Sequence, residues 1–225
     1  PSKMADVSAT EEEEGEEQDD DDDIRRASSD AERRPSGVHH LTQGELSSAL
    51  WGLAKDNRNN QVMIADAGGI PLLIAMLGDH PETHREAAGA LWSLSADPKN
   101  QMLIAEAKGI PELVELIKYG ARNATAQETA AGALSVLAQR AENRGMIADA
   151  DGIEHLVRLF DGATAETKEL VVQALLTLAI ENKENQFIIA SKLCHLLSSP
   201  VTRVEAQEYA TRVIYTMSLD RDNLG

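Results

Sequence analysis

Residues 89–96 of the chain read Gly-Ala-Leu-Trp-Ser-Leu-Ser-Ala, and this stretch returns with small changes along the sequence. Its copies read Ser-Ala-Leu-Trp-Gly-Leu-Ala at 48–54, Gly-Ala-Leu-Ser-Val-Leu-Ala at 132–138, Gln-Ala-Leu-Leu-Thr-Leu-Ala at 173–179 and, more weakly, Thr-Arg-Val-Ile-Tyr-Thr-Met at 211–217. The aliphatic anchors of the copies are Leu50, Leu91, Leu134, Leu175 and Ile214, which are 41, 43, 41 and 39 residues apart. A period near 40 is typical of repeats that stack into a solenoid.

A second marker runs in step with the first, because an asparagine stands four residues before an isoleucine in four copies. The asparagines are Asn60, Asn100, Asn143 and Asn185. In three copies a Gly-Ile pair follows, at 69–70, 109–110 and 152–153. We predict that Gly69 takes the left-handed conformation just past a helix end, and that Pro71 lies near the first position of the next helix. Each copy therefore predicts a short first helix, a turn, a second helix, a polar loop and a third helix with the anchor.

Together, in this order and spacing, the markers resemble the armadillo repeat family over roughly residues 41–225. The resemblance implies an all-α, right-handed α-α superhelix of about four repeats, with residues 41–55 as a partial N-terminal cap and stacked third helices lining a concave face. The fourth repeat lacks about five residues between Ile189 and Leu193. We expect its first two helices to merge or to be displaced.

The first 37 residues differ in composition from the rest. They carry 14 acidic and 5 basic side chains, and residues 11–23 are almost all carboxylates. Such a segment buries too little apolar surface to offset its chain entropy. We predict a disordered acidic tail at 1–37, either solubilising or holding a basic partner, and an armadillo-repeat domain at 38–225. Arg-Arg-x-Ser patterns in the tail predict phosphorylation of Ser28 and Ser36.

The net charge is −17 and both parts are negative, so we predict a protein or peptide partner, with a basic one favoured, and no nucleic acid. The single cysteine, Cys194, excludes an internal disulfide and favours an intracellular location, which we predict to be cytoplasmic rather than nuclear. No apolar run is long enough to insert directly into a membrane. Because the chain opens on Pro1 and stops inside a new repeat, we expect a fragment of a longer protein.

The sequence contains none of the common motifs of catalytic, phosphate-binding or metal sites. It contains no glycine-rich phosphate loop, no catalytic triad spacing and no paired-cysteine metal motif, so we predict no catalytic residue, no metal and no cofactor. Cys194 is interpreted as a small core residue. The function is therefore expected to depend on the surface that the repeats create.

On each third helix, we expect the anchor to face the core and the next two positions to face solvent and the groove. The first of these positions reads Trp51, Trp92, Ser135, Leu176 and Tyr215, and the second reads Gly52, Ser93, Val136, Thr177 and Thr216. Trp51 and Trp92 are the predicted anchors for a partner, since exposed tryptophan is enriched at binding hot spots. The alternative is that each ring packs against the neighbouring repeat, and a half-buried ring would satisfy both readings.

Seven residues before the first of these positions lie Arg85, Glu128, Glu169 and Glu208. The three carboxylates would favour a basic ligand, although glutamate near a helix N-terminus is also stabilised by the helix dipole alone.

The resemblance weakens where importin-α and β-catenin carry a recurring asparagine that grips an extended peptide. That place is the second of the two outward positions, and no asparagine stands there in this chain. Importin-α also has a tryptophan four residues earlier, where this chain has Ser48, Gly89, Gly132, Gln173 and Arg212. We therefore predict a looser peptide groove with single hydrogen bonds from Ser and Thr, to which Ser48, Gly89 and Arg212 also contribute.

These features favour a non-catalytic interaction scaffold that binds a partner peptide or helix on its concave face. Two alternatives stay open: a substrate-recognition segment of a larger ubiquitin ligase, and a structural component of a cytoskeletal or membrane-associated assembly.

Overall fold

The structure is a computed structural model that describes residues 42–79, 81–119 and 123–219. The chain divides into two units, Pro1–His40 and Leu41–Gly225, and every described residue belongs to the second. The predicted tail at 1–37, with Ser28 and Ser36, lies outside the described residues.

The described residues form helices and connecting turns, with no strand among them. The helices are α2 (Gln43–Ala54), α3 (Arg58–Asp66), α4 (Gly69–Asp79), α5 (His84–Leu94), α6 (Pro98–Glu106), α7 (Gly109–Tyr119), α8 (Ala124–Leu137), α9 (Ala141–Asp149), α10 (Gly152–Arg158) with the 3₁₀ turn η2 (Leu159–Asp161), α11 (Ala165–Ala179), α12 (Lys183–Ser198) and α13 (Val204–Leu219).

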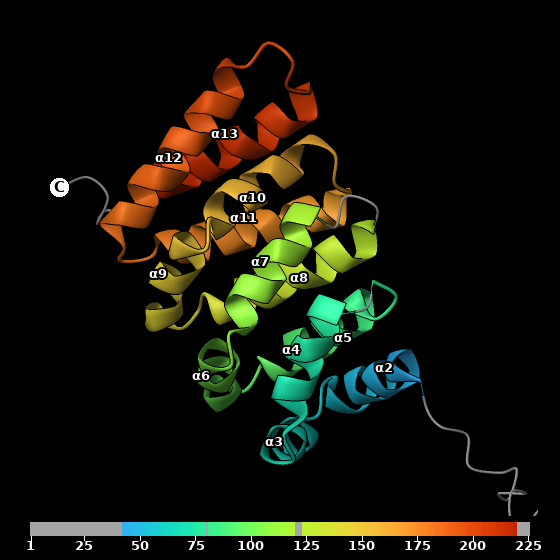
Figure 1. Ribbon diagram of the computed structural model, residues 1–225. Helices are drawn as coiled ribbons and strands as arrows, with labels where there is room; N and C mark the ends of the chain where they lie inside the picture. The colour runs from blue at the N-terminus through green and yellow to red at the C-terminus, as the bar shows by residue number, and fades with distance from the viewer. Residues whose placement is uncertain (1–41, 80, 120–122, 220–225) are drawn as a thin grey trace, which may run out of the picture. The chain divides into compact units, whose positions relative to one another are not determined.

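Within this unit, helix triplets succeed one another along the stack. The triplets α3-α4-α5, α6-α7-α8 and α9-α10-α11 rise in order from the bottom of Figure 1, and the pair α12-α13 follows at the top. The third helices α5, α8 and α11 pack side by side, α2 packs on α5, and α13 packs on α11. The predicted solenoid with a lone N-terminal helix is confirmed.

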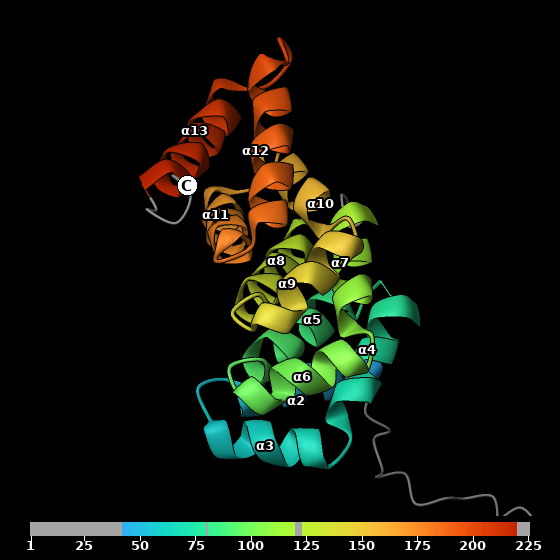
Figure 2. The same cartoon turned by 90° about the vertical axis from the view of Figure 1, so that its left-hand side faces the viewer.

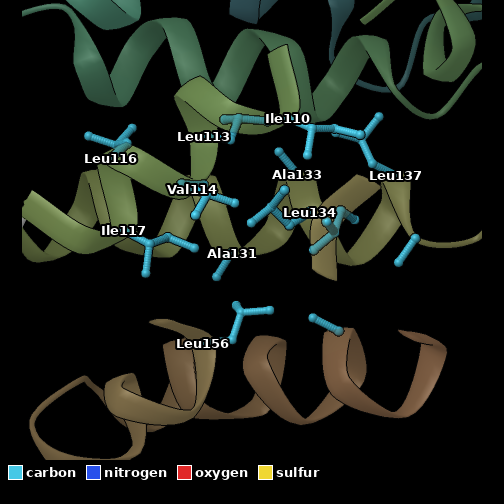
Figure 3. Close-up of a cluster of buried hydrophobic side chains, with 14 of the residues drawn as sticks. Ile110, Leu113, Val114, Leu116, Ile117, Ala131, Ala133, Leu134, Leu137 and Leu156 are labelled. Atoms are coloured by element: carbon cyan, nitrogen blue, oxygen red, sulfur yellow. The ribbon is translucent and has the colours of Figure 1, made fainter. Parts of the chain in front are cut away.

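Aliphatic side chains between the helices form the core. The anchors Leu91, Leu134 and Leu175 are fully buried, and Figure 3 shows Leu134 of α8 between side chains of α7 and Leu156 of α10. Burying one such side chain stabilises a fold by about 1.5–3 kcal/mol. Leu50 and Ile214, on the first and last described helices, are only partly buried because each has a neighbouring third helix on one side only.

The tight turn between first and second helices differs from the prediction. Gly68, not Gly69, has the positive φ of 81°, and in the next two repeats Lys108 and Asp151 take that place. Gly69 is the first residue of α4, and a β-carbon on it would lie 2.6 Å from Cγ2 of Ile64 and 2.8 Å from its carbonyl oxygen. The glycine is needed for this close approach between two helices, and the left-handed residue precedes it.

The recurring asparagine ties successive repeats together. The side-chain amide of Asn100 donates to the carbonyl oxygen of Leu94 at 3.0 Å and to that of Gln61, in the preceding repeat, at 3.2 Å. Asn143 and Asn185 make the equivalent pairs of bonds. Since each amide is buried, these bonds fix the first helices against one another.

The fourth repeat confirms one prediction and corrects another. Its first two helices merge into the single helix α12. Cys194 is exposed and is not a core residue. Its neighbour Leu193 is fully buried, and adjacent residues on a helix point about 100° apart.

Among the described residues, no single helix has both the length and the hydropathy of a membrane span; α3 and α4 reach them only as a pair that is bent by 79°.

Candidate functional site

Each tryptophan of the third helices lies on a glycine of the following repeat. A β-carbon added to Gly89 would fall 2.5 Å from Cε2 of Trp51, and one added to Gly132 would fall 2.7 Å from Cδ2 of Trp92. Both rings remain partly exposed. The rings therefore pack between repeats, as one of the two readings predicted, and still leave part of their surface exposed.

The charged residues at corresponding places of the two junctions have opposite signs. The guanidinium carbon of Arg85 lies 5.3 Å from the centroid of the Trp51 ring, in the geometry of a cation–π contact. Arg85 also pairs with Glu86 at 3.2 Å. Glu128 stands four residues before Gly132, as Arg85 stands four residues before Gly89. Trp51 is therefore already covered by a cation of its own chain, whereas Trp92 has a carboxylate nearby.

A pocket of about 390 Å³ opens beside Trp92, between α5, α8 and α11. We call it the Trp92 pocket, and its lining residues are Trp92, Glu128, Glu166, Glu169, Leu170, Val172, Gln173 and Leu176. It brings together four of the predicted groove residues. Its composition combines an aromatic ring and aliphatic side chains with three carboxylates.

One carboxylate of the pocket is partly neutralised. Glu169 accepts two hydrogen bonds from Arg212, at 2.9 Å and 2.5 Å, across the gap between α11 and α13. The bond from Arg212 is the largest cause of the lowered pKa of Glu169, and the pKa of Arg212 is raised in return. The guanidinium also lies 4.9 Å from the Tyr209 ring. Glu169 is thus held ionised at neutral pH, with its charge already balanced by Arg212.

Three further predicted residues gather on α13. Glu208, Arg212 and Tyr215 line a shallower pocket of about 520 Å³ with Val204, Gln207 and Thr211. Ser48 belongs to another pocket, of about 920 Å³, between the N-terminal ends of α2 and α5. The predicted row is therefore divided among separate hollows along the third helices.

The structure corrects several of the remaining predictions for the groove. Gly89 and Ser135 are buried, so neither can contact a partner directly; Gly89 lies beneath Trp51. The Thr177 hydroxyl donates to the carbonyl oxygen of Gln173 in its own helix at 2.8 Å. Gly52 is exposed and Ser93 is half-buried. Hydroxyl donors for a bound backbone are fewer than predicted, because helical serine and threonine bond to the preceding turn.

Sequence reasoning missed four lining residues of the pocket: Glu166, Leu170, Val172 and Gln173. All four lie on α11 beside predicted residues, and residues three or four apart share a helix face. Extending the search by one turn on either side of Glu169 would have found them.

The stack of helix triplets, with a hollowed wall of third helices, defines the chain as an α-solenoid protein. Residues 57–96 and 97–139 match the family model of the Armadillo/beta-catenin-like repeat. Residues 57–139 therefore belong to the armadillo repeat family, as the sequence markers predicted. No curated protein matches the chain by sequence.

Solved structures agree with this assignment. An engineered protein of the Northeast Structural Genomics Consortium has a TM-score of 0.66 and 26% identity, covering 80% of this chain and 76% of that chain. A computationally designed armadillo repeat protein for modular peptide recognition has a TM-score of 0.63 and 24% identity, covering 77% and 76%. A designed armadillo repeat protein in complex with the peptide (KR)4 has a TM-score of 0.62 and 23% identity, covering 78% and 77%. The last two likenesses concern the fold alone.

Proposed function

We propose that the chain is a non-catalytic scaffold that binds a segment of a partner protein along the wall of third helices. The observation that carries this proposal is the Trp92 pocket, where a partly exposed indole and aliphatic side chains meet Glu128, Glu166 and Glu169. Armadillo folds typically serve as such scaffolds. Tryptophan in a partly desolvated pocket is the residue type most often responsible for binding energy at protein interfaces.

The chemistry of the pocket favours a lysine or arginine side chain as the group that enters it. A cation over an indole face contributes about 0.5–2 kcal/mol, depending on desolvation. The Arg85–Trp51 contact shows this geometry inside the chain itself. Glu128 and Glu166 add attraction for a cation, whereas they repel the phosphates of nucleic acid. The complex of a designed armadillo protein with (KR)4 supports the choice of a basic peptide as the first probe.

Recognition by this wall would depend on side chains more than on the backbone of the partner. No asparagine stands at the outward positions, and the hydroxyls of Thr177 and Thr216 donate to their own helices. A bound extended segment would therefore keep much of its backbone solvated. We expect affinity to follow the number and spacing of cationic side chains.

The proposal is tested by titrating fluorescein-labelled (KR)4 into the full chain and its variants and measuring anisotropy at low salt. Trp92→Ala and Glu128→Gln should each weaken binding by about tenfold, since a hot-spot contact is worth more than about 1 kcal/mol. Trp51→Ala is the matched control and should change binding by less than threefold, because Arg85 already covers that ring. An unchanged affinity in folded Trp92→Ala would refute the assignment of the pocket.

A further inference from the structure

A second surface lies on the first helices, away from the Trp92 pocket. Helices α3, α6 and α9 stack one above another toward the viewer of Figure 2, and α12 begins beside α9. On each helix, two positions follow the recurring Asn and its neighbour, and six of these positions hold exposed apolar side chains. This first-helix edge comprises Val62, Met63, Met102, Leu103, Met146 and Phe187, with exposed fractions of 36 to 76%.

The regularity of the edge distinguishes it from scattered surface residues. Single exposed apolar side chains are normal in soluble proteins and need no explanation. Here they recur at the same places in consecutive repeats, whose register is fixed by the buried amides of Asn100, Asn143 and Asn185. Three of the six are methionines, whose flexible side chains suit adaptable binding surfaces. The edge is therefore a regular series of exposed apolar side chains on successive first helices.

A row of carboxylates borders the apolar row. Asp66, Glu106 and Asp149 are the last residues of α3, α6 and α9, and all three are exposed. None of them forms an ion pair within residues 42–79, 81–119 and 123–219. A negative charge at a helix C-terminus opposes the helix dipole and costs about 0.3–1 kcal/mol. Helix stability alone gives no reason for this placement in three consecutive repeats.

We propose that the first-helix edge docks an amphipathic α-helix of a partner protein. The apolar stripe of that helix covers Met63, Met102 and Met146, and its Lys or Arg flank faces the row of carboxylates. Charge complementarity at the C-terminal ends of α3, α6 and α9 favours this occupant, since Asp66, Glu106 and Asp149 would repel an acidic flank or a phosphate group there. This surface is separate from the proposed groove, because it lies on different helices and needs an apolar ligand face.

The spacing and chemistry of the edge favour a helix over an extended segment. Packed helices lie ~8–10 Å apart, and residues seven apart along a helix rise by ~10.5 Å, so heptad-spaced apolar residues meet successive repeats. The outward side chains of the edge are apolar and offer no hydrogen bonds. An extended segment would leave peptide groups unpaired against them, whereas a helix satisfies its own.

The methionines make this proposal directly testable. The chain has six, of which Met63, Met102 and Met146 lie on the edge, while Met76 is buried in α4 and serves as an internal control. The full chain is labelled with ¹³C-methyl methionine and titrated with a synthetic amphipathic helix that carries Leu in a heptad pattern and Lys on its flank. We expect the three edge methyl signals to shift together with one dissociation constant, while the Met76 signal stays in place.

Two charge variants separate docking from general attraction to an acidic protein. Asp66→Lys, Glu106→Lys and Asp149→Lys together should weaken peptide binding at least tenfold. The same number of reversals elsewhere, Glu112→Lys, Glu115→Lys and Asp161→Lys, should weaken it less than threefold. A third variant, Val62→Ser with Leu103→Ser and Phe187→Ser, keeps the reporter methionines and should also lose at least tenfold in affinity.

Several results would overturn the proposal: edge methyl signals that do not move, equal shifts with a peptide of scrambled order, or equal losses in the two charge variants. If the methyl signals of the edge methionines shift with protein concentration in the absence of peptide, the edge is instead a contact between copies of the chain. The Met76 signal also reports whether each variant is folded.

Discussion

The two tryptophan junctions of this solenoid share their packing and differ in their charge. Trp51 lies on Gly89, and Trp92 lies on Gly132, with nearly the same close approach. Arg85 covers the first ring, while Glu128 stands at the corresponding place of the next repeat, where a pocket opens. The two indoles thus differ in the charged residue of the following helix, which covers the first ring and lines an open pocket beside the second.

The next junction shows what happens when the ring is absent. Ser135 takes the place of the tryptophan and is buried, and Gln173 takes the place of the glycine and lines the Trp92 pocket. In both junctions that have a ring, a glycine lies beneath it, and the junction without a ring has no glycine. The glycine therefore accompanies the ring it supports.

The largest expected effect tests the shared part of the comparison, which is packing. Gly132→Val and Gly89→Val should each lower the free energy of unfolding by about 1–3 kcal/mol, because the new side chain overlaps an indole that is held between two helices. Urea denaturation followed by circular dichroism measures this loss. The two junctions should respond alike.

A double-mutant cycle shows whether the ring is the cause. In the background of Trp92→Ala, Gly132→Val should lower the free energy of unfolding much less than it does in the parent chain. Trp51→Ala should reduce the effect of Gly89→Val in the same way. Equal costs in both backgrounds would mean that the glycines are needed for some other reason.

The second effect tests the difference between the junctions. The charges are reversed in two separate variants, Arg85→Glu and Glu128→Arg. The first should make Trp51 available to the peptide, and the second should make Trp92 less available. Arg85→Glu uncovers Trp51 and should strengthen (KR)4 binding about three- to fivefold, whereas Glu128→Arg should weaken it about tenfold, which corresponds to ~1.4 kcal/mol. Anisotropy titrations at two salt concentrations measure both changes, and a change of equal sign in the two variants would contradict the comparison.

Much of the fold could be predicted from the sequence, because its repeat signals agree with one another. The anchor leucines and the missing residues of the fourth repeat located the core and the merged helix α12 correctly. The left-handed residue was assigned one position late, since a glycine can serve either a positive φ or a close approach. At Gly69 the requirement is the contact with Ile64.

The charge difference between the junctions could not be predicted in the same way. The repeat spacing placed Arg85 seven residues before Trp92, on the same helix. In the structure Arg85 contacts Trp51 of the preceding helix instead. Such contacts depend on how far one helix is shifted along its neighbour, and a repeat period alone does not determine that shift. Cys194 was misplaced for a related reason, because the irregular fourth repeat gives no register from which to assign its face.

The smallest effect concerns the ion pair between Arg212 and Glu169 at the Trp92 pocket. It parallels the cation–π contact of Arg85 with Trp51, because in both cases a cation of the chain occupies a place that a basic ligand would take. The pKa of Glu169 is lowered in the folded chain, first by its hydrogen bonds with Arg212. A carboxyl group with a lowered folded pKa stabilises the fold above its unfolded pKa of about 4.3 and loses that contribution as the pH falls through the folded value. Because both side chains are about half exposed, screening limits the contribution to about 0.5 kcal/mol or less.

Arg212→Gln should therefore flatten the decrease of stability between about pH 5 and pH 3, as measured by urea denaturation at a series of pH values. Lys192→Gln is the matched control, since it removes a pair with Glu154 outside the pocket and should flatten the same decrease. The two variants separate in binding: Arg212→Gln leaves Glu169 available and should strengthen (KR)4 binding about twofold, whereas Lys192→Gln should leave it unchanged. Equal binding in both would mean that Glu169 does not take part in recognition, and that the charge of the pocket depends on Glu128 and Glu166.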